Sequence, residues 1–152
     1  MIQCEFELNG KPLSDLRCGP LSMAAFSGFG RHVNRREDVC LAGVGAIPPG
    51  IYYIIDRQSG GLLGAFRDLF NGHKDWFALY ANDGKIDDVM YCADVRRGNF
   101  RLHPKGALGI SKGCITINFH ADFHRLRRML KTTACSTVPG ADLKAYGTIL
   151  VK

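Results

Sequence analysis

The chain has 152 residues, of which 46% are apolar and 22% charged. Domains typically span roughly 100–200 residues, so this length fits one globular domain and argues against a two-domain enzyme. Eighteen glycines, about 12% of the chain against a usual share of about 7%, favour a turn-rich, mainly β fold with short helices over a helical bundle. The formal net charge of +6 is compatible with an anionic partner but selects none.

The first residues lack the pattern of a secretory signal. Residues 1–8 read MIQCEFEL and alternate like a strand, whereas a signal peptide needs a basic segment followed by an apolar one. No run approaches the roughly 18 apolar residues of a membrane-spanning helix. We therefore expect a protein that is made in the cytoplasm without a signal peptide and that has no membrane span.

Six cysteines are scattered along the chain, too far apart for a Cys-x-x-Cys zinc site. Their even number suggests disulfides only if the protein reaches an oxidising compartment, and their pairing stays open. If one of them is a catalytic nucleophile, the other five cannot all pair within the chain. The six are Cys4, Cys18, Cys40, Cys92, Cys114 and Cys135.

Short apolar or alternating runs, bounded by turn residues, predict strands along most of the chain. A turn at residues 9–12 and a glycine-rich, basic loop at residues 28–38 separate the first of them. The predicted strands are Gln3–Leu8, Leu21–Ser27, Ile51–Asp56, Trp76–Tyr80, Val89–Cys92, Phe100–His103, Cys114–Asn118 and Gly147–Val151.

Two short helices are predicted among these strands. Apolar residues recur at helical spacing within Gly60–Lys74. We interpret residues 58–75 as a small lid or capping insert within a single domain of residues 1–152. A second helix is predicted at Asp122–Lys131, where apolar and basic residues fall on different sides, as is typical of a helix at the protein surface.

The residues best suited to chemistry lie between positions 100 and 118. His103 ends one predicted strand and Cys114 begins the next, and three glycines lie between them. Cysteine attacks as the thiolate and needs a nearby base or positive group, which His103 can supply. Gly113 removes a side chain beside the nucleophile and leaves backbone N–H groups free for an oxyanion. Spacing alone fits a small buried cysteine and a structural histidine equally well.

The sequence around Cys114 is recognisable. Residues 111–115 (SKGCI), with His103 upstream, resemble the signature of L,D-transpeptidases, in which a histidine precedes a Ser/Thr-His-Gly-Cys element. Lys112 stands where that family usually has histidine, and the spacing of eleven positions from His103 to Cys114 is short. In both departures the sequence resembles a branch of small L,D-transpeptidase-like toxins that are delivered by type VI secretion. Supporting matches, over roughly residues 20–152, are IPPGIYYI at 47–54, AFSG at 25–28, WFALY at 76–80, IDD at 86–88 and YGTI at 146–149.

This resemblance implies an L,D-transpeptidase-type β-sandwich with a small helical insert, which acts on peptidoglycan stem peptides. Cys114 would attack the carbonyl of meso-diaminopimelate and expel the terminal D-alanine, while His103 moves the proton. Water as the acceptor gives carboxypeptidase activity, a D-amino acid gives exchange, and another stem gives a cross-link. No metal or other cofactor is needed. The resemblance also implies a secretion-machine component and a cognate immunity protein as partners, and delivery to the periplasm of a target cell.

Three further residues are candidates for the same site. Ser111 is expected either to hydrogen-bond within the site and orient His103 or to stabilise the loop. Lys112 is expected to bind a stem carboxylate or to be a solvated loop lysine. Arg101 precedes His103 by two residues and shares its strand face, where it would bind the acidic stem or form a structural ion pair. Two aromatic residues, Tyr52 and Trp76, are expected in the core.

Three alternative functions stay open at this point. His120 and His124 are four positions apart, as in metal-binding helices, but the HExxH glutamate is absent. Either histidine could instead serve Cys114 in another Cys-His peptidoglycan amidase or endopeptidase. The basic run at residues 125–128 could make the protein a non-catalytic module that binds an anionic polymer. No aromatic stacking motif accompanies this run, which argues against nucleic acid.

Overall fold

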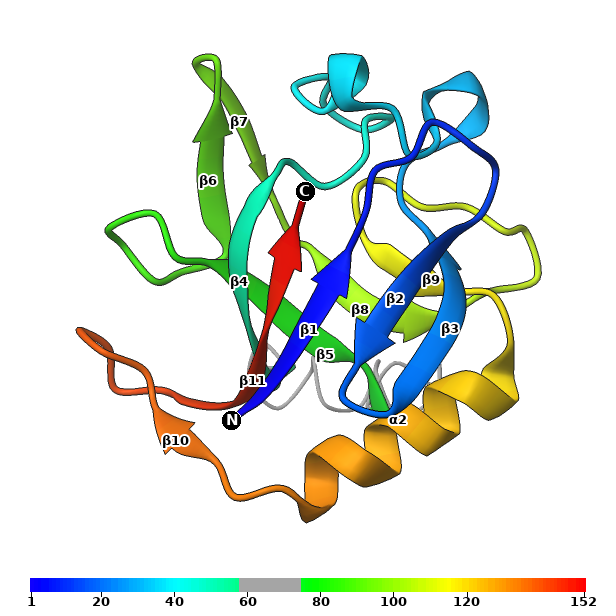
Figure 1. Cartoon of the computed structure of the whole chain (residues 1–152). Coiled ribbons are helices and arrows are strands. Elements are labelled where there is room, and N and C mark those ends of the chain that lie inside the picture. Colours follow the sequence, from blue (N-terminus) through cyan, green and yellow to red (C-terminus); the bar gives the residue numbers. More distant parts are fainter. Residues whose placement is uncertain (58–74) are drawn as a thin grey trace.

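The computed structural model describes residues 1–57 and 75–152, and in this part the predicted mainly β character is confirmed (Figure 1). The helix predicted within Gly60–Lys74, and the lid interpretation with it, lies outside the described residues. The strands of the described part are β1 (Ile2–Phe6), β2 (Ser14–Cys18), β3 (Leu21–Phe26), β4 (Gly50–Asp56), β5 (Phe77–Ala81), β6 (Val89–Cys92), β7 (Val95–Gly98), β8 (Arg101–Pro104), β9 (Ile115–Ile117), β10 (Ser136–Thr137) and β11 (Lys144–Val151).

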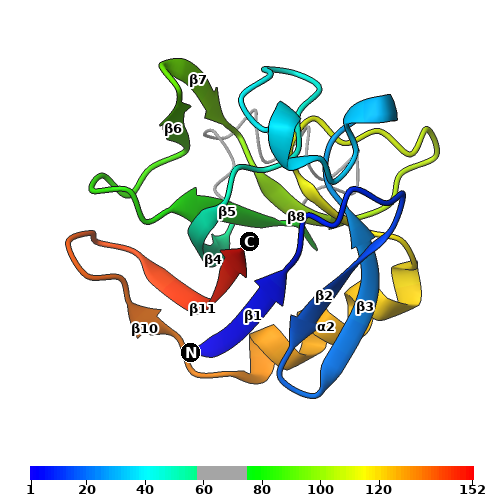
Figure 2. The same ribbon diagram turned by 45° about the horizontal axis from the view of Figure 1, so that its top comes forward.

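Most of these strands form one sheet that closes on itself. Within the described residues its order is β1-β2-β3-β9-β8-β5-β4-β11-β10. The sheet closes because β1 also pairs in parallel with β11, from Ile2 opposite Gly147 to Phe6 opposite Val151. The short strand β10 pairs with the first two residues of β11, Lys144 and Ala145 (Figure 2). The L,D-transpeptidase-type sandwich stays a prediction.

The interior of the closed sheet is filled by alternate side chains of its strands. In β2, for example, Leu16 and Cys18 point inward and are buried, while Asp15 and Arg17 face solvent. Tyr52 of β4 is fully buried in the same core, as predicted. Other large buried members of the core are Phe6, Ile54, Phe77, Leu79, Phe100, Leu102, Ile115 and Ile149.

Helix α2 (His120–Thr132) lies across one end of the sheet, where it packs against β8, β9 and β11 (Figure 1). It buries Phe123, Leu126 and Leu130. The prediction of this helix is confirmed, with a start two residues earlier than expected. None of the helices in residues 1–57 and 75–152 is long and apolar enough to cross a membrane.

Strands β6 and β7 form a separate hairpin with its own two-stranded sheet. The hairpin lies at the opposite end of the molecule from α2, beside the segment that precedes β4 (Figures 1 and 2). That segment contains two short 3-10 helices, η1 (Gly30–His32) and η2 (Arg36–Asp38). A disulfide between Cys40 and Cys92 joins the segment to the hairpin. A second disulfide joins Cys4 to Cys18, and Cys114 and Cys135 are free.

Candidate active site

Cys114 and His103 line the same pocket, which has a volume of about 630 Å³. His103 belongs to β8, and Cys114 directly precedes β9. These strands pair in parallel with His103 opposite Thr116, so Cys114 falls beside Arg101. Because side chains alternate along strands, Cys114 and Thr116 lie on the same face as Arg101 and His103. Strand pairing therefore brings His103 and Cys114, the two residues predicted from the sequence, to the same pocket.

His103 is held in one orientation and one tautomer. Its side chain is 5% exposed, and Nδ1 lies 2.7 Å from the carbonyl oxygen of Pro104. A carbonyl can only accept, so Nδ1 carries the proton and Nε2 of the neutral ring is the basic nitrogen. Nε2 lies 3.4 Å from Oγ1 of Thr116. The imidazole is thus prepared to accept a proton at Nε2.

Trp76 supports the imidazole from one side. Its indole stacks on the His103 ring, with centroids 4.1 Å apart and planes at 17°. The guanidinium of Arg57 in turn lies 5.8 Å from the centroid of the Trp76 ring. Trp76 therefore lines the pocket, whereas the sequence led us to expect a core residue. Local sequence contains no signal for this contact because β8 brings the imidazole to it from far along the chain.

The sulfur of Cys114 lies in a partly buried position, 3.8 Å from the carbonyl oxygen of Asn99. Burial raises the pKa of the Cys114 thiol, because the thiolate loses hydration there. The backbone N–H and the charge of Arg101 lower the pKa in part, and the carboxylate of Asp88 raises it further. The resting group is therefore a thiol, and a nucleophilic role for it would require a base.

Gly113 lies where no other residue fits without displacing its surroundings. Its φ of +110° is in the region that side chains with a Cβ rarely adopt. A Cβ at this position would lie 2.5 Å from Nη2 of Arg97 and 2.8 Å from Cε1 of Phe100. The glycine before the nucleophile is thus required by close packing in the structure, in addition to any role in leaving space for substrate.

Ser111 fixes the backbone around the nucleophile. It is buried, and its hydroxyl donates to the carbonyl oxygen of Cys114 at 2.7 Å. The hydroxyl oxygen of Ser111 in turn accepts a hydrogen bond from the backbone N–H of Gly28 at 3.3 Å. These bonds place Ser111 within the site and tie the loop before Cys114 to the end of β3, which suits the loop-stabilising alternative.

Arg101 and Lys112 both line the pocket, in different settings. Arg101 forms a two-pronged ion pair with Asp88, with N–O distances of 2.7 and 2.6 Å. Of the two roles predicted for Arg101, the structural ion pair is therefore present. Lys112 is exposed at the rim, where its charge is accessible to a ligand. Both side chains add positive charge to the pocket.

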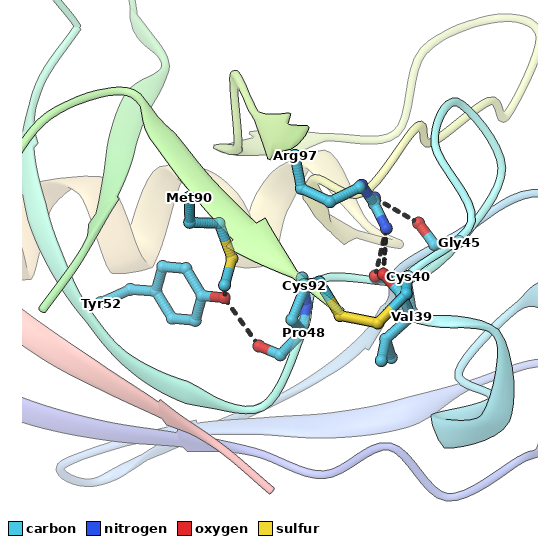
Figure 3. The surroundings of a disulfide bond; sticks show 9 residues. Val39, Cys40, Gly45, Pro48, Tyr52, Met90, Cys92 and Arg97 are labelled. Atoms are coloured by element: carbon cyan, nitrogen blue, oxygen red, sulfur yellow. Dashed lines mark hydrogen bonds between the residues drawn. A yellow bond between two sulfur atoms is a disulfide. The ribbon is translucent and has the colours of Figure 1, made fainter. Parts of the chain in front are cut away.

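Arg97 of β7 is a residue of the site that the sequence did not single out. Its side chain is 5% exposed, and its guanidinium donates to the backbone carbonyls of Val39, Gly45 at 2.9 Å and Ala46 at 3.4 Å (Figure 3). We call residues 39–46 and the β6–β7 hairpin (89–98) the pocket wall, since both segments line the pocket. Arg97 joins these two parts of the pocket wall.

The pocket is strongly positive. Its described lining contains five cationic side chains and a single carboxylate, that of Asp88, which is paired to Arg101. Such a lining favours an anionic ligand. A second hollow of about 790 Å³ has neither cysteine nor histidine among its described lining residues and offers no comparable chemistry. The five cations of the first pocket are Arg57, Arg96, Arg97, Arg101 and Lys112.

The histidines of α2 do not join the pocket in the described part of the chain. His120 donates through Nε2 to the carbonyl oxygen of Lys105 at 2.8 Å, and the centroid of its ring lies 6.5 Å from that of His124. Neither is among the described residues that line the pocket with Cys114. Residues 1–57 and 75–152 contain no group of three or more side chains suited to hold a metal ion.

These features define a protein with a cysteine–histidine pair in a positive pocket at the rim of a closed β-sheet. Residues 22–141 match the model of the Tlde1 domain, and the chain therefore belongs to the Tlde1 domain family. This is a family of type VI secretion effectors. No curated protein and no solved structure matches the chain.

Proposed function

We propose that the protein is an antibacterial effector that modifies peptidoglycan as a cysteine L,D-carboxypeptidase or L,D-transpeptidase with an L,D-transpeptidase-type domain. The observation that carries the proposal is the pocket shared by Cys114 and His103, in a chain from a family of type VI secretion effectors. The positive lining suits the carboxylates of a peptidoglycan stem peptide. The alternative amidase with His120 or His124 is disfavoured, since the described pocket lining includes neither histidine.

In the first step, Sγ of Cys114 attacks the carbonyl carbon of meso-diaminopimelate in a tetrapeptide stem. Nε2 of His103 accepts the thiol proton, as its tautomer allows. The tetrahedral intermediate then collapses, the bond to D-alanine breaks, and His103 gives its proton to the leaving amine. A thioester on Cys114 and free D-alanine result.

In the second step, a nucleophile attacks the thioester and His103 accepts its proton. Water yields a tripeptide stem, a free D-amino acid yields an exchanged stem, and the amine of another stem yields a cross-link. In each case the bond between the carbonyl carbon and Sγ then breaks, and His103 returns the proton to Sγ, so that the thiol of Cys114 is regenerated. Protein groups are sufficient for every proton transfer in this scheme, so we propose that the reaction uses no metal or other cofactor.

Two cationic residues of the pocket are proposed to bind the acidic stem. Lys112 is exposed at the rim and can approach a carboxylate directly. Arg101 is already paired to Asp88, so its role is to hold positive potential near the thiol and to fix this part of the pocket. Ser111 and Gly113 set the backbone of the nucleophile.

The proposed site of action is the periplasm of a target cell, reached by type VI secretion from the cytoplasm of the producer. A component of the secretion machine and a cognate immunity protein are the protein partners that this proposal requires. Peptidoglycan stems and D-amino acids are the small partners. Nucleic acid is not among them.

The experiment is to direct the chain to the periplasm of a Gram-negative host and to profile its muropeptides by mass spectrometry. We expect tetrapeptide stems to be replaced by tripeptide or exchanged stems. Cys114→Ala should abolish the change, while Cys135→Ala, which removes the other free cysteine, should leave it intact. Unchanged tetrapeptide stems with the active chain would contradict the proposal.

A further inference from the structure

The pocket wall consists of two segments that are far apart in the sequence and lie outside the closed sheet. Residues 39–46 contribute Ala42 and Gly43 to the pocket, and the hairpin contributes Val89, Arg96 and Gly98 beside Arg97. The Cys40–Cys92 disulfide links the segments across 52 positions of sequence (Figure 3). It is the covalent bond between the two parts of the pocket wall.

The pocket wall reaches the nucleophile through two contacts. Asn99 directly follows β7, and its carbonyl oxygen lies 3.8 Å from Sγ of Cys114. The guanidinium of Arg97, whose hydrogen bonds hold residues 39–46, also lies against Gly113. A displacement of the hairpin would therefore move groups that touch the nucleophile or its neighbour.

The Cys4–Cys18 disulfide has a different setting. Cys4 and Cys18 are direct partners in the antiparallel ladder of β1 and β2, and both are buried in the core of the sheet. Backbone hydrogen bonds already hold these strands together, and neither cysteine lines the pocket. The chain thus contains an internal control: one disulfide at the pocket wall and one away from it.

We propose that the Cys40–Cys92 disulfide builds the catalytic pocket, so that activity depends on oxidation of this pair and is low while both cysteines are reduced. The claim about activity rests on the proposed function, whereas the claim about pocket structure does not. A chain held reduced in the cytoplasm of its producer would then carry an incomplete pocket. It would complete the pocket in a compartment that oxidises thiols.

The redox step is a thiol–disulfide exchange. One thiolate of the pair attacks a disulfide oxidant, and a mixed disulfide forms as one oxidant thiol leaves. The second thiolate of the pair then attacks the chain's own sulfur in the mixed disulfide, which closes the Cys40–Cys92 bond and releases the other oxidant thiol. Two thiols of the chain are oxidised and one disulfide of the oxidant is reduced to two thiols. Oxidised glutathione serves as the oxidant in the test.

The structural test uses hydrogen–deuterium exchange of the full chain, with Cys135→Ala as the background. We compare the oxidised parent with Cys40→Ala/Cys92→Ala and with the matched control Cys4→Ala/Cys18→Ala. Exchange at residues 39–46 and 89–98 should rise in the first double variant only. Equal exchange there in both double variants would overturn the proposal.

The activity test uses the same proteins on isolated peptidoglycan sacculi, with muropeptide products measured by mass spectrometry. Displacing one side of a reactive site by about an ångström costs up to roughly a hundredfold, so we expect activity to fall by about tenfold to a hundredfold without Cys40–Cys92. The Cys4→Ala/Cys18→Ala chain should keep most of its activity. Full activity of a folded Cys40→Ala/Cys92→Ala chain would overturn the proposal.

A reversible measurement covers the case in which Cys40→Ala/Cys92→Ala does not fold. In the Cys4→Ala/Cys18→Ala chain, Cys40–Cys92 is the one disulfide that a reductant can open. Treatment with dithiothreitol should lower activity and raise exchange in the pocket wall, and oxidised glutathione should reverse both. Unchanged exchange after complete reduction would overturn the proposal. If no form acts on sacculi but exchange responds as expected, the proposed function fails and the structural claim stands.

Discussion

The closed sheet is stabilised by different interactions from those that stabilise the pocket wall. Each strand of the closed sheet has a backbone ladder on both sides, including the parallel seam of β1 and β11. The two parts of the pocket wall are joined mainly by the guanidinium of Arg97 and by the Cys40–Cys92 disulfide. Cys114 and His103 lie at the closed sheet, and part of the pocket lining lies on the pocket wall. The stability of the sheet and the shape of the pocket can therefore be changed separately.

The largest loss of stability is expected where β1 pairs with β11 and closes the sheet. A Cβ at Gly147 would lie 2.2 Å from the carbonyl oxygen of Ile2, so Gly147→Ala must push β1 away from β11. Overpacking against backbone costs on the order of 3 kcal/mol in the free energy of unfolding. Urea denaturation measures this loss. Gly106→Ala, where a Cβ would meet no atom within 4 Å, is the control, and an equal loss in both variants would contradict the prediction.

A smaller effect on stability, but a clear one on activity, is expected where the pocket wall meets the nucleophile. Gly113→Ala strains a backbone at φ +110° and pushes on Arg97 and Phe100, at a cost of about 2 kcal/mol. Peptidoglycan cleavage should fall about tenfold or more, since the residue before Cys114 moves. Gly109→Ala is the matched control, because its φ is also positive but its Cβ would meet only the flexible Lys105 side chain. Similar activity of the two variants would refute this explanation.

Substitutions of Asp88 and Arg101 should shift the pKa of Cys114 in opposite directions if the charges of these two side chains set it. Asp88 raises the pKa of Cys114, and Arg101 lowers it. Asp88→Asn should therefore lower this pKa, and Arg101→Gln should raise it. Alkylation of Cys114 by iodoacetamide across pH, in a Cys135→Ala background, measures both. The two substitutions break the same ion pair, so shifts in one direction would mean that lost structure outweighs charge.

The smallest effect, a small rise in KM, is expected for Lys112 at the rim of the pocket. Lys112 is exposed, and an exposed charge contributes little to binding in water. Lys112→Gln should raise the KM for peptidoglycan fragments less than about threefold and leave kcat and the urea midpoint unchanged. Lys112→Arg, which keeps the charge, should match the parent. A large fall in kcat for Lys112→Gln would place this residue in the catalytic step and would contradict its assignment to the rim.

The hydrophobic pattern predicted most strands whose inward residues are apolar, and it missed three others: β2, β7 and the two-residue strand β10. Strand β2 was missed because one of its inward residues is Ser14, whose hydroxyl donates to the carbonyl of Glu7. Strand β7 was missed because its buried side chain is Arg97. In β2 and β7, hydrogen bonds from the buried polar side chain to backbone outside the strand take the place of hydrophobic burial. The local spacing of apolar residues does not predict such partners.

The two central residues of the candidate site were easier to predict than their surroundings, and both line the same pocket. His103 and Cys114 are close in the sequence, and each is a residue type with characteristic reactivity. The pocket wall depends instead on contacts between residues 39–46 and 89–98, and spacing does not report such pairings. The pairing of the cysteines likewise required the structure, in which Cys114 and Cys135 are free.

Because β8 and β9 pair in parallel, the length of the loop between them does not set the relative position of His103 and Cys114. Registration of His103 opposite Thr116 fixes where Cys114 lies, whatever path the chain takes between the strands. Lengthening a surface loop is inexpensive, about 0.6 kcal/mol for each doubling. Residues between Pro104 and Ser111 can thus be added or removed without altering the positions of His103 and Cys114. Sequence distance between the two residues is a poor diagnostic of this site, and strand register is the better one.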